Sequence, residues 1–556
     1  MQFRSKQAYP VYFTIGNIWK HIRQKPSRQG QVLLAYLPTS KLSHITNKSP
    51  HHHCISNLFH HCMQTIVKPL ESAGHDGITL VSGNGAARRC FPILVAYVGD
   101  YLEQILISLV KTGTCPICPA PQNNIGNWDS ILEPHDAQKI TEALNAIDKG
   151  AMEFTKACVE AGIKPVQCIF WKNLPYINIY HSITPDILHQ LYQGLLKHLI
   201  RWIWAVCGDA EVYARCCHLP PNHHIWLFMK GISHLSHVTN TEHDQISRFL
   251  LALVADICLP DGHFNAQLVH TVHAVLDFIY LARYPIHTSE TLAQMNDTLH
   301  AFHLNRDILV SLGICTHFNI PKLYNSGHYF ELIQFFGAAD NFNTKFTEWL
   351  HIDLAKDAYA STNFKDEFPQ MTHWLEWKEH VMHHEKYICH CFETSFNMPL
   401  HVQKPLPSLI PECRQWMAKH PTHQGVPIDI ICTKYGAMQF IPALSRFITQ
   451  YQYSEYLKAQ VEAASTSIHI PFSKISVFHR LKFVSYDVYS LNPLDKVVVD
   501  SIHTDPVHFD KYRNVVPGQF DTIVIQVKDS DDGTGLNLKG MFFMFSLIWF
   551  KLHSSC

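Results

Sequence analysis

The sequence has no excess of charge of either sign: 45 Lys and Arg residues stand against 46 Asp and Glu residues, and the formal net charge is −1. A strongly basic chain would have indicated nucleic-acid binding directly. The balance found here neither supports nor excludes it, because a local basic groove can lie within a neutral total. Six basic residues are candidates for lining such a groove, with ordinary solvated surface charge as the alternative for each: Lys20, Arg23, Lys25, Arg28, Arg88 and Arg89.

The sequence also lacks a long apolar run and a regular disulfide spacing. The longest late apolar run, from Met541 to Phe550, is shorter than the roughly 20 residues that a membrane-spanning helix needs. The start of the chain lacks the apolar segment of a secretory signal. The 17 cysteines are scattered, and a chain of 556 residues does not need disulfide bonds to form a core. We therefore expect a soluble intracellular protein without a membrane partner, whose thiols are mostly free.

Size and composition predict a folded protein of several domains. A length of 556 residues exceeds what one hydrophobic core usually organises, so about two to four domains are expected. Hydrophobic residues make up 47% and aromatic residues 12% of the chain, which is enough for real cores and unlike a disordered chain. Histidine is abundant, with 40 residues, but most are isolated, which favours surface and cap positions over a histidine-built metal cluster.

Short strands bounded by turns are predicted in the first hundred residues, at 10–15, 32–37 and 78–81. The run from Cys90 to Val98, CFPILVAYV, is apolar on both of its alternating faces, which is typical of a central strand covered on both sides. It leads to Asp100, and open sheets commonly place their chemistry at strand ends. The alternative is that Asp100 only caps a helix over 101–110, and the pattern favours neither.

Beyond the first hundred residues the periodicity is mainly helical and then turns to β. Apolar positions at helical spacing predict helices at 58–70, 187–206, 267–283, most of 330–395 and 427–463. The Pro-rich segment 397–411 is predicted to be a linker. After residue 465, strands are predicted at 476–489, 497–502 and 522–527, which indicates a small C-terminal β domain.

Two short motifs have the spacing of metal ligands. Cys115-Pro-Ile-Cys118 is half of a tetrahedral thiolate site, and a complete structural zinc site needs two further ligands. Asp186-x-x-His189 places a carboxylate and an imidazole about one helical turn apart on one face. These four residues are the candidates for a structural Zn²⁺ site, and Asp186 and His189 are alternatively only a motif of the helical region.

A third candidate is Glu348, in a segment from Thr344 to Tyr359 that is predicted to be helical. Five residues of this segment share one stripe, so that the glutamate would face the body of the fold: Glu348, His351, Ile352, Ala355 and Tyr359. A buried carboxylate is costly unless it is paired or bound to a metal. The alternative is a partly exposed glutamate that pairs with Lys345 or His351.

Ten segments, spread in order over most of the chain, then carry a family resemblance. They include YPVYFTIGNIWKHIRQKPS, RRCFPILVAYVGDYLEQ, CPIC, GIKPVQCIFWKNLPYINIYHSITPDILHQLYQG, FNIPKLYNSGHYFELI and GAADNFNTKFTEWLHIDLAKDAYASTNFKDEFPQMTHWLE. On these segments the chain resembles the Plavaka-type transposases of the Kyakuja-Dileera-Zisupton (KDZ) superfamily, which is abundant in fungal genomes.

The resemblance implies an α/β fold with a ribonuclease H-like core and an Asp-Asp-Glu catalytic triad. The second aspartate of the family matches Asp100, in a D-Y-P-E-type motif with Leu102 in place of proline, and the family's glutamate matches Glu348. The C-x-x-C and D-x-x-H motifs match Cys115, Cys118, Asp186 and His189. Carboxylates of this kind hold two Mg²⁺ (or Mn²⁺) ions that activate a nucleophile and stabilise the leaving oxygen. Transposon-end cleavage and strand transfer on DNA, in the nucleus and as a homo-oligomer, are the implied activity and partners.

The resemblance also implies the domain organisation. We expect the first part of the ribonuclease H-like core at 1–110, a mainly helical insertion with the zinc motif at 111–329, a helical return to the core at 330–396, a linker with helices at 397–470, and a β-rich domain at 471–556.

The chain departs from the family pattern at a few positions. The first catalytic aspartate and its strand, expected upstream of Tyr9, are absent, Asn84 stands where an aspartate is usual, and Tyr324 replaces a histidine of a K-L-H-x-x-x-H-Y pattern. We therefore expect an incomplete core and an inactive, N-terminally truncated transposon copy. Two alternatives are a catalytically dead, zinc-stabilised DNA-binding or interaction module, and a structural zinc protein unrelated to DNA.

Overall fold

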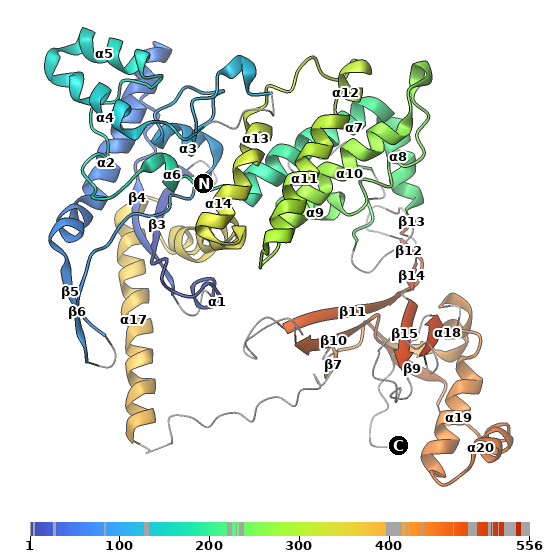
Figure 1. The fold of residues 1–556 in the computed structure, drawn as a ribbon. Helices are drawn as coiled ribbons and strands as arrows, with labels where there is room; N and C mark the ends of the chain where they lie inside the picture. The colour runs from blue at the N-terminus through green and yellow to red at the C-terminus, as the bar shows by residue number, and fades with distance from the viewer. Residues whose placement is uncertain are drawn as a thin grey trace. The chain divides into compact units, whose positions relative to one another are not determined.

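The computed structural model describes residues 2–3, 6–25, 29–82, 85–126, 133–219, 225–228, 231–232, 238–395, 414–418, 420–435, 437–470, 472–486, 497–509, 513, 515–516, 518–520, 522–526 and 541–545. The chain divides into two compact units, one of Met1–Arg215 with Gly231–Asn397 and one of Cys216–Lys230 with Met398–Cys556. Helices predominate, and the sheets are small and antiparallel (Figure 1). No helix among the described residues is both long and apolar enough to span a bilayer.

The strands of the first unit form antiparallel pairs. The pairs are β1 (Gln2–Phe3) with β2 (Lys6–Gln7), β3 (Tyr9–Thr14) with β4 (Gln31–Leu37), and β5 (Ile78–Val81) with β6 (Ala87–Cys90). These pairs confirm the three strands predicted at 10–15, 32–37 and 78–81. The turn residue Asn84 lies outside the described residues.

The central strand predicted from Cys90 to Val98 is wrong. β6 ends at Cys90, and the chain after it makes only one isolated parallel bridge, from Tyr97 to Ile183. Phe91, Ile93 and Val95 are exposed, because no layer covers that side of the segment. The described residues of this unit therefore contain two-stranded sheets, and the predicted ribonuclease H-like core is not confirmed.

The β3–β4 hairpin has helices on two sides (Figure 1). On one side lies α2 (Lys48–Asp76), whose Phe59 ring is 6.1 Å from the ring of Tyr9, and which shares a core with Leu37. On the other side Tyr36 packs near Phe368 of α17 (Glu367–Ser395). The N-terminal hairpin thus connects α2 with the helices that follow residue 344.

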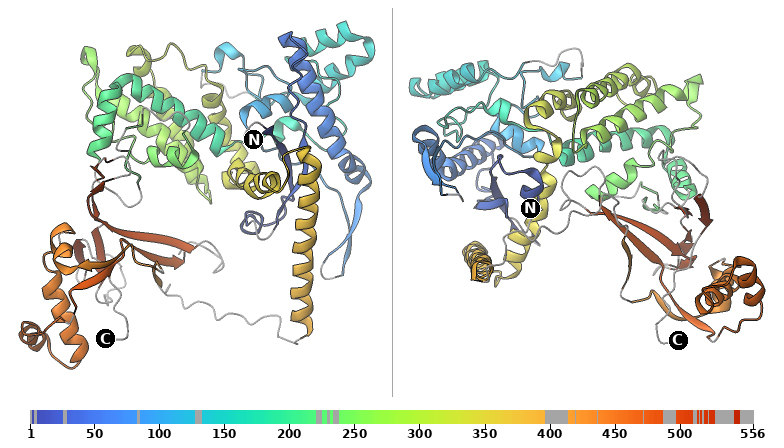
Figure 2. Two further views of the ribbon diagram at one scale, coloured as in Figure 1. Left: turned by 180° about the vertical axis from the view of Figure 1, so that it is seen from behind. Right: turned by 60° about the horizontal axis from the view of Figure 1, so that its bottom comes forward.

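The remaining helices of the first unit are mostly short. They are α1 (Lys20–Arg23), α3 (Tyr101–Ile107), α4 (Ala137–Asn145), α5 (Ala151–Glu160), α6 (Ile179–Ser182), α7 (Lys197–Cys207), α8 (Asp209–His218), α9 (Asn240–Ser247), α10 (Asn265–Ala282), α11 (Ser289–Asn305), α12 (Ile308–Ser311), α13 (Pro321–Tyr324) and α14 (Tyr329–Phe336), with the short turn η6 (Asn325–His328) between the last two. α10 and α11 pack side by side (Figure 2), and α10 confirms the helix predicted at 267–283.

Two π-helical segments interrupt the regular helices. The first, η4 (Ile187–Leu196), continues into α7, and the second, η8 (Ile352–Lys356), joins α15 (Thr344–His351) to α16 (Asp357–Ala360). Ile352, which the predicted stripe placed inside, is exposed, whereas Ala355 and Tyr359 of the same stripe are buried. π-helical turns occur frequently at functional sites.

The second unit contains strands in the region after residue 465, where they were predicted, and its sheets also include two strands before that residue. Its largest sheet has the order β14-β11-β10-β7, formed by Gln519–Phe520, Val497–Asp505, Arg480–Tyr486 and Arg414–Met417. Smaller pairs join β8 (His423–Pro427) to β9 (Lys474–Val477), β12 (His508–Phe509) to β13 (Val515–Val516), and β15 (Thr522–Gln526) to β16 (Met541–Phe545). Its helices are α18 (Ile428–Lys434), α19 (Phe440–Gln452) and α20 (Lys458–Ser465). The predicted linker at 397–411 lies outside the described residues.

Candidate functional site

Asp100 begins α3. Its Oδ1 accepts a hydrogen bond from the backbone N–H of Glu103 at 2.8 Å, which is the usual role of an aspartate at a helix N-cap. Asp100 therefore forms the helix cap that the alternative expected, and its catalytic assignment stays a prediction. Its carboxylate is partly exposed, so capping leaves the second carboxylate oxygen available to another partner.

Glu103 is a neighbour of Asp100 to which the sequence assigned no role. The Tyr97 hydroxyl donates a hydrogen bond to Glu103 Oε1 at 2.6 Å. Burial raises the pKa of Glu103 to about 7, and the charge of Asp100 adds to this effect, while hydrogen bonds from Tyr97 and Tyr9 oppose it. A glutamate on the third residue of a helix that an aspartate caps is the sequence signal that could have identified it.

Asp186 is a buried carboxylate with a complete set of partners. It begins η4, its side chain is 2% exposed, and its Oδ2 accepts from the backbone N–H of His189 at 2.7 Å. Its Oδ1 accepts from both the backbone N–H and the hydroxyl of Thr344, at 3.1 and 2.8 Å. Asp186 thereby attaches the start of η4 to the start of α15.

His189 connects Asp186 to Glu348. Its Nδ1 lies 2.8 Å from Asp186 Oδ2, and its Nε2 lies 3.1 Å from Glu348 Oε1. Burial lowers the pKa of His189, but the hydrogen bonds and charges of the two carboxylates outweigh burial and raise it to about 10. His189 is therefore a cation between two carboxylates at neutral pH.

Glu348 is partly exposed, with 39% of its side chain accessible, as the sequence alternative expected. Its partner, however, is His189, which that alternative did not name. The ring of His351 instead stacks on Tyr12 of β3, with ring centroids 5.5 Å apart.

Lys322 of α13 lies beside this group. Its Nζ donates a hydrogen bond to the carbonyl oxygen of His189 at 2.8 Å. Burial lowers its pKa, and the charges of Asp100 and Asp186 both act in the opposite direction. Because Lys322 interacts electrostatically with both Asp100 and Asp186, Asp100 lies in the same region of the first unit as the linked residues Asp186, His189 and Glu348. Within the described residues, however, Asp100 and Glu348 belong to no group of three Asp, Glu, His or Cys residues whose ligand atoms lie within 4.8 Å of one another.

Cys115 and Cys118 form a second group, with His328. One ligand atom of each lies within 4.8 Å of the others, and all three residues are buried. His328 Nε2 is 3.4 Å from Cys115 Sγ and 3.6 Å from Cys118 Sγ. The Tyr324 hydroxyl is 3.2 Å from Cys118 Sγ. Hydrogen bonding from Cys115, against the effect of burial, lowers the pKa of the Cys118 thiol to about 4, with His328 and Tyr324 contributing.

The structure thus divides the four residues that the sequence proposed as one zinc site. The two cysteines lie with His328, whereas Asp186 and His189 lie with Glu348. Neither short motif indicated His328, which lies 210 residues after Cys118 along the chain. The signal in the sequence was the K-L-x-x-x-x-H-Y pattern around it.

Several of the basic residues proposed for a DNA groove have partners within the protein. Lys20 Nζ lies 3.0 Å from Asp340 Oδ2, and Arg23 donates to the carbonyl and side-chain oxygens of Asn341 at 3.1 Å. Arg89 donates to the carbonyl oxygen of Asp76. These contacts favour a structural role for the three residues. Arg28 lies outside the described residues.

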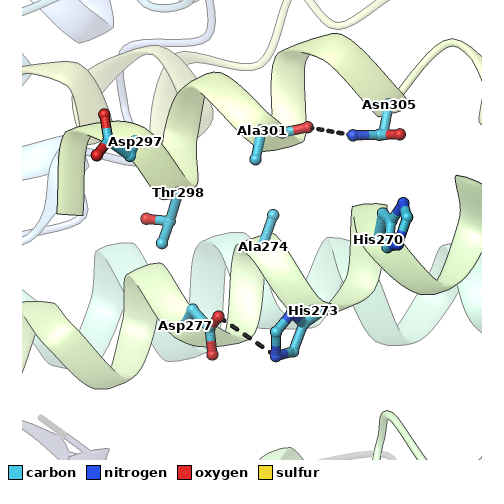
Figure 3. A pocket seen from close by; sticks show the side chains of 8 residues that line it. All are labelled: His270, His273, Ala274, Asp277, Asp297, Thr298, Ala301 and Asn305. Atoms are coloured by element: carbon cyan, nitrogen blue, oxygen red, sulfur yellow. Dashed lines mark hydrogen bonds and ion pairs between the residues drawn. The ribbon is translucent and has the colours of Figure 1, made fainter. Parts of the chain in front are cut away.

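A shallow pocket of about 380 Å³ lies between α10 and α11 (Figure 3). His273 and Asp277 form an exposed pair on its wall, with 3.3 Å between Nε2 and Oδ2. The pocket is lined by none of the residues described above.

Fold and site together define a helix-rich protein with two chemically distinct groups of ligand side chains, one of carboxylates and imidazole and one of thiols and imidazole. In a comparison with protein families, residues 1–203 match the Plavaka transposase family, which confirms the resemblance over this region. The matched region contains Asp100, both cysteines, Asp186 and His189, and ends before His328 and Glu348. No curated protein matches the chain.

Proposed function

We propose that this chain is a DNA transposase of the Asp-Asp-Glu type, or derives from one, with Asp100 and Glu348 as its catalytic carboxylates. One observation carries the proposal. Glu348, which lies outside the region matched to the Plavaka transposases, contacts His189 of the D-x-x-H motif inside that region. A helix far along the chain thus brings its glutamate to the motif that the family match includes.

The donor atoms suit a hard divalent cation. Asp100 and Glu348 offer carboxylate oxygens, which are the ligands that Mg²⁺ prefers, and both are partly exposed, so a hydrated ion has access. Bound there, Mg²⁺ or Mn²⁺ would activate the attacking water or 3′-hydroxyl and stabilise the leaving oxygen of a phosphodiester.

The residues around the carboxylates would hold them in place. His189 binds one oxygen of Glu348, and Asp186 binds His189. The Lys322 ammonium, which donates to the carbonyl oxygen of His189, is proposed to contact a DNA phosphate as well. The β3–β4 hairpin and the parallel bridge from Tyr97 to Ile183 support a relation to the ribonuclease H-like fold. Nuclear localisation, DNA as partner and self-association are part of the proposal.

We further propose that the activity of this chain is low. Among the described residues no third carboxylate lies within ligand distance of both Asp100 and Glu348, and Glu103 is engaged with Tyr97. A second function follows from the same observation. The group of Cys115, Cys118 and His328 is already assembled, which favours a catalytically dead, metal-stabilised module that binds DNA or another partner.

Supercoiled plasmid DNA tests both functions with the full chain. We expect slow nicking that requires Mg²⁺ or Mn²⁺ and that disappears in Asp100→Asn and in Glu348→Gln. Both variants keep the shape of the side chain, and the asparagine in the first also keeps the helix cap. Glu331→Ala, which changes an exposed glutamate on α14, is the matched control and should nick as the wild type does.

Binding without nicking would favour the second function, provided that the affinity falls as salt rises, because phosphate contacts release counterions. Neither binding nor nicking would refute both. Nicking that survives Glu348→Gln would refute the catalytic assignment of Glu348.

A further inference from the structure

We propose that Cys115, Cys118 and His328 bind one Zn²⁺ ion, that the Tyr324 hydroxyl takes the fourth coordination position, and that the ion clamps residues 321–329 against the Asp186–His189 turn. Binding of the ion is independent of the proposed catalytic function. Its effect on Glu348 rests on that function.

The separations between the imidazole nitrogen and the two sulfurs are those that a tetrahedral zinc ion requires. With Zn–S of about 2.3 Å and Zn–N of about 2.0–2.1 Å, a tetrahedral angle separates sulfur from nitrogen by about 3.6 Å. The two observed separations, from His328 Nε2 to the two sulfurs, are 3.4 and 3.6 Å. Two thiolates and an imidazole are a soft to borderline donor set, which selects zinc over magnesium or calcium.

The candidate for the fourth position is an oxygen beside Cys118. The Tyr324 hydroxyl lies 3.2 Å from Cys118 Sγ and is carried by α13, directly before the turn that carries His328. Tyr324 is 7% exposed, and Cys115, Cys118 and His328 are 3% exposed or less, so bulk water has little access to the site. A closed set of four protein ligands is typical of structural rather than catalytic zinc.

Neighbouring groups support the charged form of the site. The backbone N–H of Ile117 donates to Cys115 Sγ at 3.4 Å. Asn325 Oδ1 accepts a hydrogen bond from the Cys115 thiol at 3.1 Å, and rotation of this amide would present its N–H₂ to a metal-bound thiolate instead. Such donors stabilise thiolate ligands and fix their orientation.

The ion would join two distant parts of the chain next to the carboxylate cluster. Cys115 and Cys118 follow α3, which Asp100 caps, while His328 lies 213 residues after Cys115. Contacts on both sides of the ligands reach η4: Lys322 donates to the carbonyl oxygen of His189, and the Tyr329 hydroxyl donates to that of Asp186 at 2.9 Å. Tyr329 follows His328 directly and is fully buried, so a shift of His328 would also move Tyr329. Tyr329 contacts the Asp186–His189 turn, whose histidine binds Glu348, so this turn would be displaced as well.

Zinc content of the purified full chain is the first test. We expect about one zinc per chain in the wild type and none in Cys115→Ala, Cys118→Ala or His328→Ala. Two controls should retain the ion: Cys158→Ala, which removes an equally buried cysteine, and His189→Ala, which removes the histidine that sequence reasoning grouped with the cysteines. The proposal would be overturned if the wild type contained no zinc. It would also be overturned if His328→Ala retained zinc and His189→Ala lost it.

Cobalt substitution keeps the proposal testable if a ligand variant does not fold. Co²⁺ in the wild type should give the intense visible bands of a tetrahedral ion and a thiolate charge-transfer band, whereas an octahedral spectrum would contradict the site. Tyr324→His should bind zinc about 10-fold more tightly than the wild type, and Tyr324→Phe about 10-fold more weakly. Equal affinity of all three would exclude Tyr324 as a ligand.

Hydrogen exchange tests whether the ion holds residues 321–329 against the Asp186–His189 turn. After zinc removal by a chelator, hydrogen exchange of the backbone amides at 186–192 and 344–348 should accelerate, and zinc but not Mg²⁺ should restore protection. Unchanged exchange would refute the clamp while leaving the zinc site intact. If zinc binds and slows hydrogen exchange but the protein does not nick DNA, the zinc proposal stands and only the proposed catalytic function is refuted.

Discussion

The two ligand groups of this protein differ in how far each is assembled. Cys115, Cys118 and His328 lie within a ligand-to-ligand span of 4.8 Å and are buried on all sides. Asp100 and Glu348 are partly exposed, and His189 holds one oxygen of Glu348. The atoms of the first group have the spacing of a metal site, whereas Asp100 and Glu348 would have to move to share one ion.

The difference matches two kinds of metal chemistry. A buried site of soft ligands retains its ion as part of the fold. An open site of carboxylates, partly satisfied by a neighbouring imidazole, lets hydrated ions and substrate exchange. The two groups nevertheless share residues 321–329, which contact the metal ligands on one side and the Asp186–His189 turn on the other.

Asp186→Ala gives the largest expected effect on the carboxylate group. Asp186 is buried and accepts hydrogen bonds from His189 and Thr344, so its removal leaves a buried imidazolium and two backbone donors without a partner. We expect a loss of about 3–5 kcal/mol in the free energy of unfolding. Urea denaturation at pH 7 measures it.

The matched control for that variant is Asp136→Ala. Asp136 also begins a helix, α4, and accepts from the backbone N–H groups of Gln138 and Lys139, but it is exposed. The loss of an exposed cap costs about 1 kcal/mol. Equal losses in the two variants would mean that Asp186 is only a cap. Zinc content should remain unchanged in both, which separates the two ligand groups.

Glu103→Gln should stabilise the protein, and only above acidic pH. The folded-state pKa of about 7 lies above the ordinary value of 4.5, so stability from the protonated carboxyl is present below pH 4.5 and is lost as the pH rises through 7. Glutamine keeps the acceptor for Tyr97 without the charge. We expect the variant to gain about 1–3 kcal/mol at pH 8 and nothing at pH 4. Urea denaturation at both pH values is the measurement, and a gain at pH 4 would contradict the assignment.

The sequence predicted local structure well wherever one pattern decides it. The alternation in 10–15 and 32–37 and the helical spacing in 267–283 correspond to β3, β4 and α10. It failed from Cys90 to Val98 because an apolar run indicates a buried strand only if other elements cover it, and the periodicity of the run carries no information about its neighbours.

The site was predictable only in part, for a similar reason. Spacing identified Asp186 with His189 and Cys115 with Cys118, because each pair lies within one turn. Their third partners, Glu348 and His328, come from residues far along the chain, and only the packing of α13, η6 and α15 brings them together. Of the predicted stripe, Ala355 and Tyr359 are buried, but Ile352 at the start of η8 is exposed.

Glu348→Gln gives the smallest expected change and tests whether His189 is charged. Because the pKa of His189 is raised from 6.5 to about 10, its contribution to stability is present below pH 6.5 and is lost as the pH rises through about 10. Glutamine removes one of the two charges that raise this pKa. Since Glu348 is 39% exposed, solvent screens the pair, and we expect a loss of about 1 kcal/mol or less at pH 6. The loss should vanish near pH 11, where the imidazole is neutral in both proteins, and urea denaturation at the two pH values measures it.

The control is Glu376→Gln. The Glu376 carboxylate lies 3.6 Å from His373 in an exposed pair on α17, and this variant should change stability at neither pH. An equal loss at both pH values in Glu348→Gln would mean that Glu348 contributes through packing and that His189 is neutral in the fold.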